Sequence, residues 1–394
     1  MSKFDPIYAA VDSAEPDPDA DFSLPGWIYR DTEFFDLEME RVIRPSWQIV
    51  CHDSDLEGPG SYRTLDYLGE SVIVVRGDDG ALRAFTNVCR HRAMRLVEGP
   101  AGCTKKLVCP YHAWTYGLDG RLTGVPMKAE YPALRLEDNG LNSEELELWN
   151  GFVFVRLEDG GMPSVAEMMA SFEAEVAQYR FVDLRRMGDL RLRPRAVNWK
   201  NVGDNYSDNL HIPVGHDGLT RLLGDSYRIE AHGWADRLYG EVQPTNPKQN
   251  FWERFYSRHL PRADHLGEGA QRRWLYYKLW PNMAFDIYAD QVDFMQWLPE
   301  TPTTCTLREM TFALPDDSRE MKLVRYANWR INRVVNAEDT RLIERVQAGM
   351  ASRFYGTGPL AASEVCLRSF ARKIRAFIPE ARQSKAPPPG WSKA

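Results

Sequence analysis

Two short pairs of metal-binding residue types constrain this chain more than any other feature of its sequence. Cys89 and His91 form a Cys-x-His pair, and Cys109 and His112 form a Cys-x-x-His pair further along. Two thiolates and two imidazoles are the ligand set of a [2Fe–2S] cluster in which two histidines replace two cysteines on one iron. The segment around these residues must therefore fold so that two loops converge.

A structural zinc site is the alternative interpretation of four Cys and His ligands in two pairs. Zinc sites usually pair Cys with Cys or His with His, whereas each pair here holds one of each. A mixed pair suits two loops that each give one ligand to each iron. We expect Val108, Pro110, Tyr111 and Trp114 to provide an apolar cover that limits water access. The Rieske type of cluster is therefore favoured over zinc.

A second group of metal-binding residue types, Asp208, His211 and His216, lies downstream. Two imidazoles and one carboxylate on one face of Fe(II) leave positions open for O₂ and substrate. The two histidines are i and i+5, which places them about 140° apart on an ideal helix. One helix cannot aim both at one metal, so we expect Pro213 to end the helix after His211 and Gly215 to free the loop.

Length and composition exclude several classes of protein. A chain of 394 residues suits about two domains. No apolar run reaches the roughly 18 residues that a membrane span needs. A formal charge of −7, with acidic and basic residues interspersed, does not indicate nucleic-acid binding. The acidic start is unlike a signal peptide, so we expect a cytoplasmic protein that binds neither membrane nor nucleic acid.

The order of β-like and helical segments predicts an α+β chain. Helical spacing is expected at 202–210 and 321–354, and the runs between them indicate strands of a large antiparallel sheet. Four parts are predicted: an N-terminal segment (1–45) that packs on the catalytic domain, a small all-β cluster domain (46–157), a catalytic iron domain (158–382) and a disordered tail (383–394).

The residues around both metal motifs resemble one known family. Two segments closely resemble the cluster loops of the large (alpha) subunit of Rieske non-haem iron oxygenases: Cys89-Arg90-His91-Arg92 and Cys109-Pro110-Tyr111-His112-Ala113-Trp114. Ala93 and Ala113 stand where the family commonly has Gly, which tolerates positive φ better. The stretch 198–216 resembles the family's iron-binding segment, with its Asn-Trp-Lys opening and Asp-x-x-His-x₄-His spacing. The resemblance implies a helix-grip (START-like) catalytic domain.

The resemblance also implies roles for single residues. The segment 336–347 resembles the family's Glu-Asp-x-x-Leu-x-Glu-x-x-Gln motif, which implies that Asp339 is the third iron ligand, with Glu338 as the alternative. Asp208 lies at i−3 from His211 and can reach its second nitrogen. In the family, the matching acid also contacts the second cluster histidine of a neighbouring subunit, here His112, and so bridges electrons between chains. Asn205 is expected near the iron.

The implied function is that of a terminal oxygenase. It would use O₂ and electrons from a ferredoxin or flavin reductase, because no dinucleotide-binding signature occurs in the chain. A homotrimer is expected, with a small beta subunit left open. Asn205 lies three residues before Asp208, a spacing similar to that of mono-oxygenating and demethylating members. Oxidative N- or O-dealkylation is therefore the leading reaction, with aromatic cis-dihydroxylation and a simple Rieske electron-transfer protein as alternatives.

The expected substrate is a small, mostly apolar compound, with aromatic compounds and their catabolism as the leading class. Four aromatic residues of the predicted sheet are candidates for lining its cavity: Phe285, Tyr288, Phe294 and Trp297. Because side chains alternate along a strand, only about half of the residues on such strands can face inward. An aromatic lining favours an apolar ligand.

Overall fold

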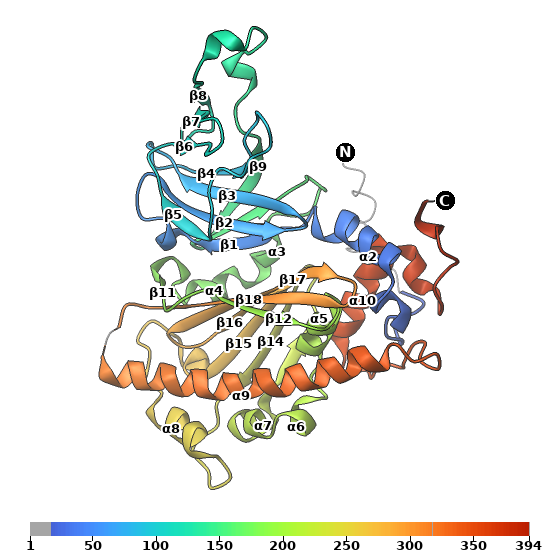
Figure 1. Ribbon diagram of the computed structural model, residues 1–394. Helices are drawn as coiled ribbons and strands as arrows, with labels where there is room; N and C mark the ends of the chain where they lie inside the picture. The colour runs from blue at the N-terminus through green and yellow to red at the C-terminus, as the bar shows by residue number, and fades with distance from the viewer. Residues whose placement is uncertain (1–16, 317, 394) are drawn as a thin grey trace. The chain divides into compact units, whose positions relative to one another are not determined.

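The computed structural model describes residues 17–316 and 318–393, and they form two compact units. The smaller unit runs from Arg44 to Asp159. The larger unit contains the described residues up to Ile43 and resumes at Gly160. Both are drawn in Figure 1 and are treated separately below. The predicted α+β class is confirmed, whereas the predictions for residues 1–16 and 394 lie outside the described residues.

The smaller unit consists of β-strands. A seven-stranded antiparallel sheet has the order β1-β10-β9-β4-β3-β2-β5, and a second sheet has the order β6-β7-β8. Asn150 and Gly151, both at positive φ, make the tight turn between β9 and β10. The strands are β1 Gln48–His52, β2 Ser61–Tyr67, β3 Glu70–Arg76, β4 Leu82–Thr86, β5 Ala101–Cys103, β6 Leu107–Val108, β7 Thr115–Tyr116, β8 Leu122–Gly124, β9 Ser143–Trp149 and β10 Phe152–Arg156.

The larger unit is built on an eight-stranded antiparallel sheet in the order β11-β18-β17-β16-β15-β14-β13, with β12 also paired to β18. Its strands are β11 Arg185–Arg186, β12 Arg191–Arg195, β13 Arg228–Glu230, β14 Ala235–Glu241, β15 Arg273–Leu279, β16 Met283–Ile287, β17 Gln291–Thr301 and β18 Thr304–Ala313. Its helices are α2 Thr32–Glu38, α3 Val165–Met169, α4 Glu173–Ala177, α5 Trp199–Ser207, α6 Ile212–Gly215, α7 Asp217–Leu223, α8 Phe251–His259, α9 Arg319–Gly349 and α10 Val365–Phe377.

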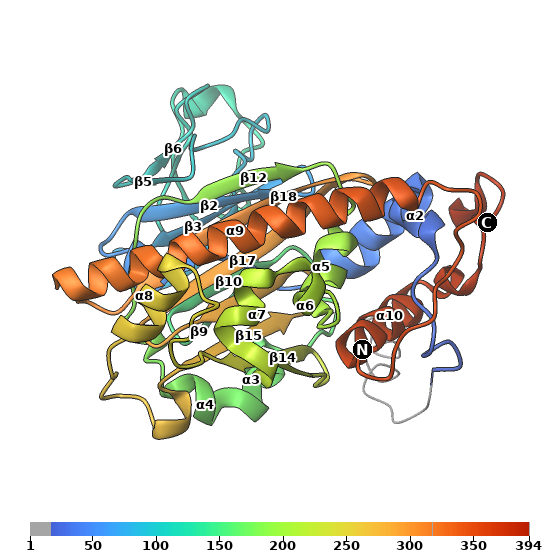
Figure 2. The ribbon, with the colours of Figure 1, turned by 90° about the horizontal axis from the view of Figure 1, so that it is seen from below.

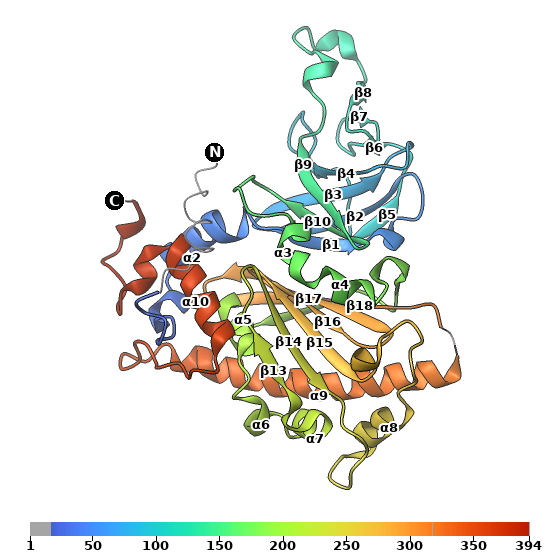
Figure 3. The ribbon, with the colours of Figure 1, turned by 180° about the vertical axis from the view of Figure 1, so that it is seen from behind.

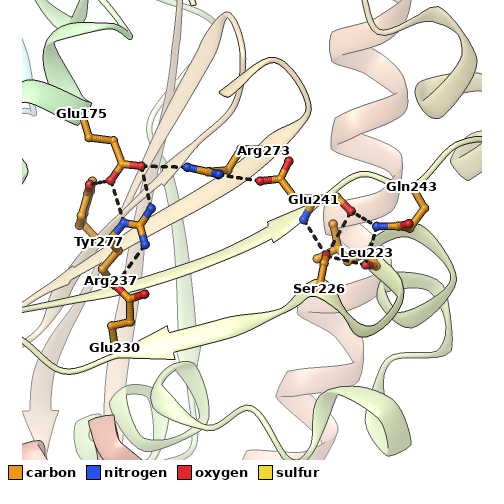
Figure 4. Close-up of polar contacts among 9 residues, drawn as sticks. All are labelled: Glu175, Leu223, Ser226, Glu230, Arg237, Glu241, Gln243, Arg273 and Tyr277. Carbon is orange, nitrogen blue, oxygen red and sulfur yellow. Dashed lines mark hydrogen bonds and ion pairs between the residues drawn. The ribbon is translucent and has the colours of Figure 1, made fainter. Parts of the chain in front are cut away.

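One face of the large sheet is closed by the α3–α4 segment. Phe172 packs on Tyr277 with ring centroids 4.7 Å apart. Figure 4 shows that Glu175, on α4, accepts hydrogen bonds from Arg237, Arg273 and Tyr277 on β14 and β15, at 2.5–3.2 Å. Burial opposes ionisation of Glu175, but these donors outweigh it and lower the pKa of its carboxyl. This face is therefore filled by polar and aromatic contacts.

Helices α5, α6, α7 and α9 lie on the opposite face. Figures 1 and 2 show the long helix α9 running across the sheet, with α5–α7 beside it, and α9 contacts all three. The predicted helix 202–210 corresponds to α5, which starts earlier because the Asn198 side chain caps it by accepting from the Lys200 N–H. Among residues 17–316 and 318–393, no helix is long and apolar enough to cross a membrane.

Pro213 has a different role from the one expected. Helix α5 already ends at Ser207, and Asp208 is extended, with φ −92° and ψ 137°. Pro213 stands in the first turn of α6, where its missing N–H has no partner to lose. The proline therefore starts a helix, and the chain turns between His211 and His216 because α6 is only four residues long.

The C-terminal prediction is wrong for the residues that the structure describes. Instead of a disordered tail, the chain ends in a 3₁₀ turn, η11 (Trp391–Lys393), next to α2 (Figure 3). The Trp391 ring packs on Trp27 and Phe34, with centroids 6.0 and 6.5 Å apart. Glu33 accepts hydrogen bonds from the N–H groups of Gly390 and Ser392. One tryptophan after a proline run thus finds an aromatic partner far away in sequence.

Candidate active site

The two cluster loops of the smaller unit have matching backbone turns. The N–H of Ala93 donates to the Cys89 carbonyl at 3.1 Å, and the N–H of Ala113 donates to the Cys109 carbonyl at 2.9 Å. Both alanines have φ of 55°. This left-handed conformation favours glycine, because an L side chain crowds the following carbonyl there. The replacement of Gly by Ala thus leaves the turn unchanged and adds strain.

The four expected cluster ligands come together between these turns. The sulfurs of Cys89 and Cys109 belong to buried side chains, and the rings of His91 and His112 lie 4.6 Å apart. Within the described part of the chain, the Nδ1 atoms of both histidines are buried without a hydrogen-bond partner. Burial raises the pKa of the Cys89 thiol, so a thiolate at this position needs a positive partner. Two unpartnered nitrogens beside two buried thiols fit a Rieske cluster.

The cover of this site is only partly the one expected. The Trp114 ring stacks on His91, with centroids 4.8 Å apart and planes 7° apart. In contrast, Val108, Pro110 and Tyr111 are exposed. A two-residue strand such as β6 has room for one inward side chain, Leu107, so its neighbour points to solvent. The apolar cover therefore comes from Trp114, and the outer surface of this loop stays accessible.

In the larger unit, the helices bring the two histidines and Asp339 together. The potential ligand atoms of His211, His216 and Asp339 all lie within 4.8 Å of one another. Asp339 Oδ1 is 2.9 Å from His216 Nε2 and 3.7 Å from His211 Nε2. His211 precedes α6, His216 separates α6 from α7, and Asp339 comes from α9. The arrangement has the composition of a two-histidine, one-carboxylate Fe(II) site.

Each imidazole is oriented by a carboxylate on its other nitrogen. Asp208 Oδ2 is 3.0 Å from His211 Nδ1, and Glu338 Oε2 is 2.8 Å from His216 Nδ1. A proton on each Nδ1 leaves each Nε2 free for a metal ion. The sequence missed this contact of Glu338, which was considered only as an alternative ligand. Its position next to Asp339 and the helical geometry of α9 were the only signals.

The electrostatics of the site favour a cation. Asn205 Nδ2 donates to Asp339 Oδ1 at 2.7 Å, so Asn205 lies beside the expected ligand. Burial opposes the charge of Asp339, but hydrogen bonds from His211 and His216 outweigh it and lower its pKa to about 2. Burial also opposes the charge of His211, but Asp208 and Asp339 raise its pKa to about 9. These carboxylates stabilise positive charge where a metal ion would bind.

A cavity of about 420 Å³ adjoins the three residues. Its lining includes four tyrosines, Phe294 and several charged groups, among them Tyr206, Tyr227, Tyr276, Tyr326, Phe294, Arg191, Arg193, Asp286, Asp293 and Glu309. The expected aromatic residues are therefore accompanied by charged ones, which argues against the mostly apolar substrate that was expected. Several residues of β16–β18 that line the cavity are polar, whereas the face of a sheet that packs in an ordinary core carries aliphatic side chains.

Of the four aromatic candidates, only Phe294 lines the cavity. Phe285 is paired opposite Phe294 on the neighbouring strand but is outside the cavity lining, and it packs on Phe181 with centroids 5.8 Å apart. Trp297 is fully buried beneath α5. Tyr288 packs edge-on against Trp274 at 5.0 Å. Whether an aromatic side chain lines the cavity depends on the face of the sheet to which it points and on the helices that cover that face. The sequence alone did not place those helices.

Comparisons with known proteins agree with both units. Residues 174–380 match the family model for the ring hydroxylating alpha subunit (catalytic domain), and residues 46–137 match the Rieske [2Fe-2S] domain. The carnitine monooxygenase oxygenase subunit of Escherichia coli (strain K12) is 30% identical over 92% of this chain and 93% of its own. The glycine betaine monooxygenase oxygenase subunit of Pseudomonas aeruginosa is 33% identical over 52% of this chain and 47% of its own.

Solved structures share the fold. A quaternary ammonium Rieske monooxygenase superposes with a TM-score of 0.77 at 24% identity, over 93% of this chain and 100% of that one. Naphthalene 1,2-dioxygenase from Rhodococcus sp. superposes with a TM-score of 0.75 at 19% identity, over 91% and 95%. With these matches and the geometry of both units, the chain belongs to the family of Rieske ring-hydroxylating oxygenase alpha subunits, the terminal oxygenases that contain a [2Fe–2S] cluster and a mononuclear iron.

Proposed function

We propose that this oxygenase hydroxylates a carbon bonded to nitrogen, in the simplest case an N-methyl group of a quaternary ammonium compound or related amine. The observation that carries the proposal is the cavity beside His211, His216 and Asp339, which combines tyrosine rings with carboxylates. Aromatic faces and acids attract an alkylated ammonium ion. Relatives that act on carnitine and glycine betaine support the same substrate class.

The overall reaction balances as a mono-oxygenation. One O₂, two electrons and two protons convert the N–CH₃ group to N–CH₂OH and release one water. The carbinolamine then loses formaldehyde and leaves the dealkylated amine. Cys89, Cys109, His91 and His112 would hold the cluster, and the His211, His216 and Asp339 site would hold the iron. When bound, these groups supply the electron transfer and O₂ reduction.

The remaining residues bind and orient. The rings of Tyr206, Tyr227 and Tyr276 line the cavity and offer π faces to the ammonium group, which keeps one N-methyl carbon toward the metal site. Tyr206 is itself held by a hydrogen bond to Asp286 at 2.5 Å. Asp208 fixes the His211 ring and stabilises its Nδ1 proton. The chain thus positions the substrate and keeps both imidazoles aligned during turnover.

Electrons must reach the iron from outside the chain. Members of the family take them from a separate reductase or ferredoxin, and we propose the same donor class here. We further propose a homotrimer in which the electron passes from His112 of one chain to Asp208 of the next. In support, Asp208 already holds His211 and is part-exposed, so it is accessible to a neighbouring chain.

The test is product analysis with the reconstituted electron-transfer partners. N-methylated amines are expected to give formaldehyde and O₂ uptake in equal amounts. A cis-diol from an aromatic compound, with no aldehyde, would establish ring dihydroxylation instead. Only two irons per chain and no O₂ consumption would establish a simple electron-transfer protein.

The bridge is tested with Asp208→Ala. This variant is expected to retain the cluster's visible spectrum and to bind iron about 10- to 100-fold more weakly, because the partner of His211 is lost. It is expected to lose turnover even when Fe(II) is supplied at saturating concentration, because the path between chains is cut. Full turnover of Asp208→Ala with the native reductant would contradict the bridge.

A further inference from the structure

Four side chains form a row across the cavity wall from β15 to β18. Tyr276, Asp286, Asp293 and Thr311 are paired opposite one another on neighbouring strands, and all four line the cavity. Directly opposed residues point to the same face of a sheet, with Cβ atoms about 4.5–5.5 Å apart. Two carboxyl groups therefore stand next to each other in the wall of the proposed substrate site.

Neither carboxyl group forms a salt bridge with another described residue, although the Thr311 hydroxyl and the Arg191 guanidinium favour the charged form of Asp293. Asp286 accepts a hydrogen bond from the Tyr206 hydroxyl at 2.5 Å, and Asp293 accepts one from Gln291 Nε2 at 3.2 Å. Burial raises the pKa of Asp286 to about 7 and that of Asp293 to about 6. Like charges directly opposed on a sheet are destabilising. A positive partner from outside the protein would offset this cost.

The third acid of the same wall shows the contrast. Glu309 is 3.1 Å from Arg193 and 3.5 Å from Arg191, so it is paired with two guanidinium groups that together exceed its charge. Arg325, which also lines the cavity, is paired with Asp290 at 2.7 Å. Among the described aspartates and glutamates that line the sheet side of the cavity, only those of the opposed pair lack a salt bridge.

The other basic groups of the lining are at its outer side. Lys322 and Arg333 both lie on α9, and both residues are exposed. Their charge is screened by solvent, whereas Asp286 and Asp293 are partly buried, so their charge is screened less. The cavity thus favours a cation at the sheet, whereas the described arginine and lysine side chains of its lining are either paired with Glu309 or Asp290 or exposed to solvent.

The geometry points to Asp286 and Asp293 as the residues that select the charge of the substrate. The pair binds a cationic group, so this chain favours amines with a net positive charge over zwitterions that also carry a carboxylate. This inference rests on the proposed N-dealkylation and narrows its substrate class. It separates this chain from the carnitine and glycine betaine oxygenases, whose named substrates are zwitterions, because the negative charge of the pair would repel a substrate carboxylate.

Binding to the holoenzyme tests charge selection without turnover. Calorimetric titrations would compare choline, its uncharged carbon analogue 3,3-dimethylbutan-1-ol, and the zwitterion glycine betaine. Choline is expected to bind at least about tenfold more tightly than either of the other two. Asp286→Asn and Asp293→Asn are each expected to weaken choline binding about tenfold and to leave the uncharged analogue within about twofold.

The control variant is Asp264→Asn, which removes one charge from an exposed loop residue outside the cavity lining. It is expected to bind choline like the unmodified protein. Glycine betaine binding as tightly as choline, or choline binding no tighter than the uncharged analogue, overturns the inference. Because these comparisons use the unmodified protein, they decide the matter even if an Asn variant does not fold.

Formaldehyde assays separate this inference from the proposed function. If choline binds selectively but no N-methylated compound releases formaldehyde, the proposed N-dealkylation is contradicted and the proposed charge selection is supported. If formaldehyde forms equally well from choline and glycine betaine, in both the unmodified enzyme and Asp286→Asn, the reaction assignment stands and charge selection is overturned.

Discussion

Glu338 and Asp339 are neighbours in sequence but contact the metal site in different ways. Asp339 points its Oδ1 at both Nε2 atoms, whereas Glu338 holds the far side of the His216 ring at 2.8 Å. Together with Asp208 on His211, it gives each imidazole its own carboxylate partner. Such partners fix the ring orientation and raise the basicity of the ligating nitrogen.

Glu338→Gln is therefore expected to weaken iron binding by about 10- to 100-fold, because the charge that holds His216 is lost. Chelator competition against Fe(II) would measure the change. Glu344→Gln, on the exposed side of the same helix, is the matched control and is expected to retain iron normally. Equal iron retention in the two variants would show that Glu338 does not support the ligand.

Asp286 gives the protein a pH-dependent stability. Burial raises its pKa from 3.8 to about 7, so the folded chain keeps a proton that the unfolded chain has already released. The free energy of unfolding thus falls as pH rises from about 4 to about 7 and is level above that. Asp293, with a pKa of about 6, acts in the same direction.

Asp286→Asn removes this titration. The substrate-free variant is expected to exceed the unmodified protein in stability by an amount that grows from pH 5 to pH 8, on the order of 1–3 kcal/mol. Denaturant unfolding at fixed pH steps would measure it. A stability difference that is the same at both ends of this range would show that Asp286 titrates normally.

At the scale of elements, the two cluster turns have alanine where the backbone favours glycine. Ala93 and Ala113 both have φ of 55° and close the same hydrogen-bonded turn after a cysteine. Ala93→Gly and Ala113→Gly are each expected to raise the free energy of unfolding by about 0.5–1 kcal/mol. Ala101→Gly, in strand β5, is the control and is expected to lower it by a similar amount. Thermal unfolding of cluster-loaded protein would measure all three.

Local motifs and long-range packing differed in how far they could be predicted. The cluster ligands sit in two short loops, so spacing alone identified Cys89 and His91 with their partners. Asp339 was recognisable from its helical motif. The acids of the cavity were not, because Asp286 matters only through its register opposite Asp293 and through the helices that cover that face. Trp391 was missed for the same reason, since its partners lie at the other end of the chain.

At the scale of the whole molecule, the proposed trimer makes the chains interdependent. Cys89→Ser removes a cluster ligand and His211→Ala removes an iron ligand, so each variant alone is expected to be inactive. Refolded together in equal amounts, they are expected to recover about a quarter of normal turnover, because half of the sites keep iron and half of those adjoin an intact cluster in a cyclic assembly. Formaldehyde release would measure it, and no recovery in verified mixed trimers would place the electron path within one chain.

The ligands of the cluster and the ligands of the mononuclear iron are completed at very different times during protein synthesis. The loops that carry Cys89 to His112 leave the ribosome as one contiguous segment, and their β unit is complete by Asp159. The second site has no carboxylate ligand until α9 has emerged, since Asp339 lies far behind His211 in the chain. The order of synthesis therefore allows the first site to be loaded with iron and sulfide before the second site has all its ligands.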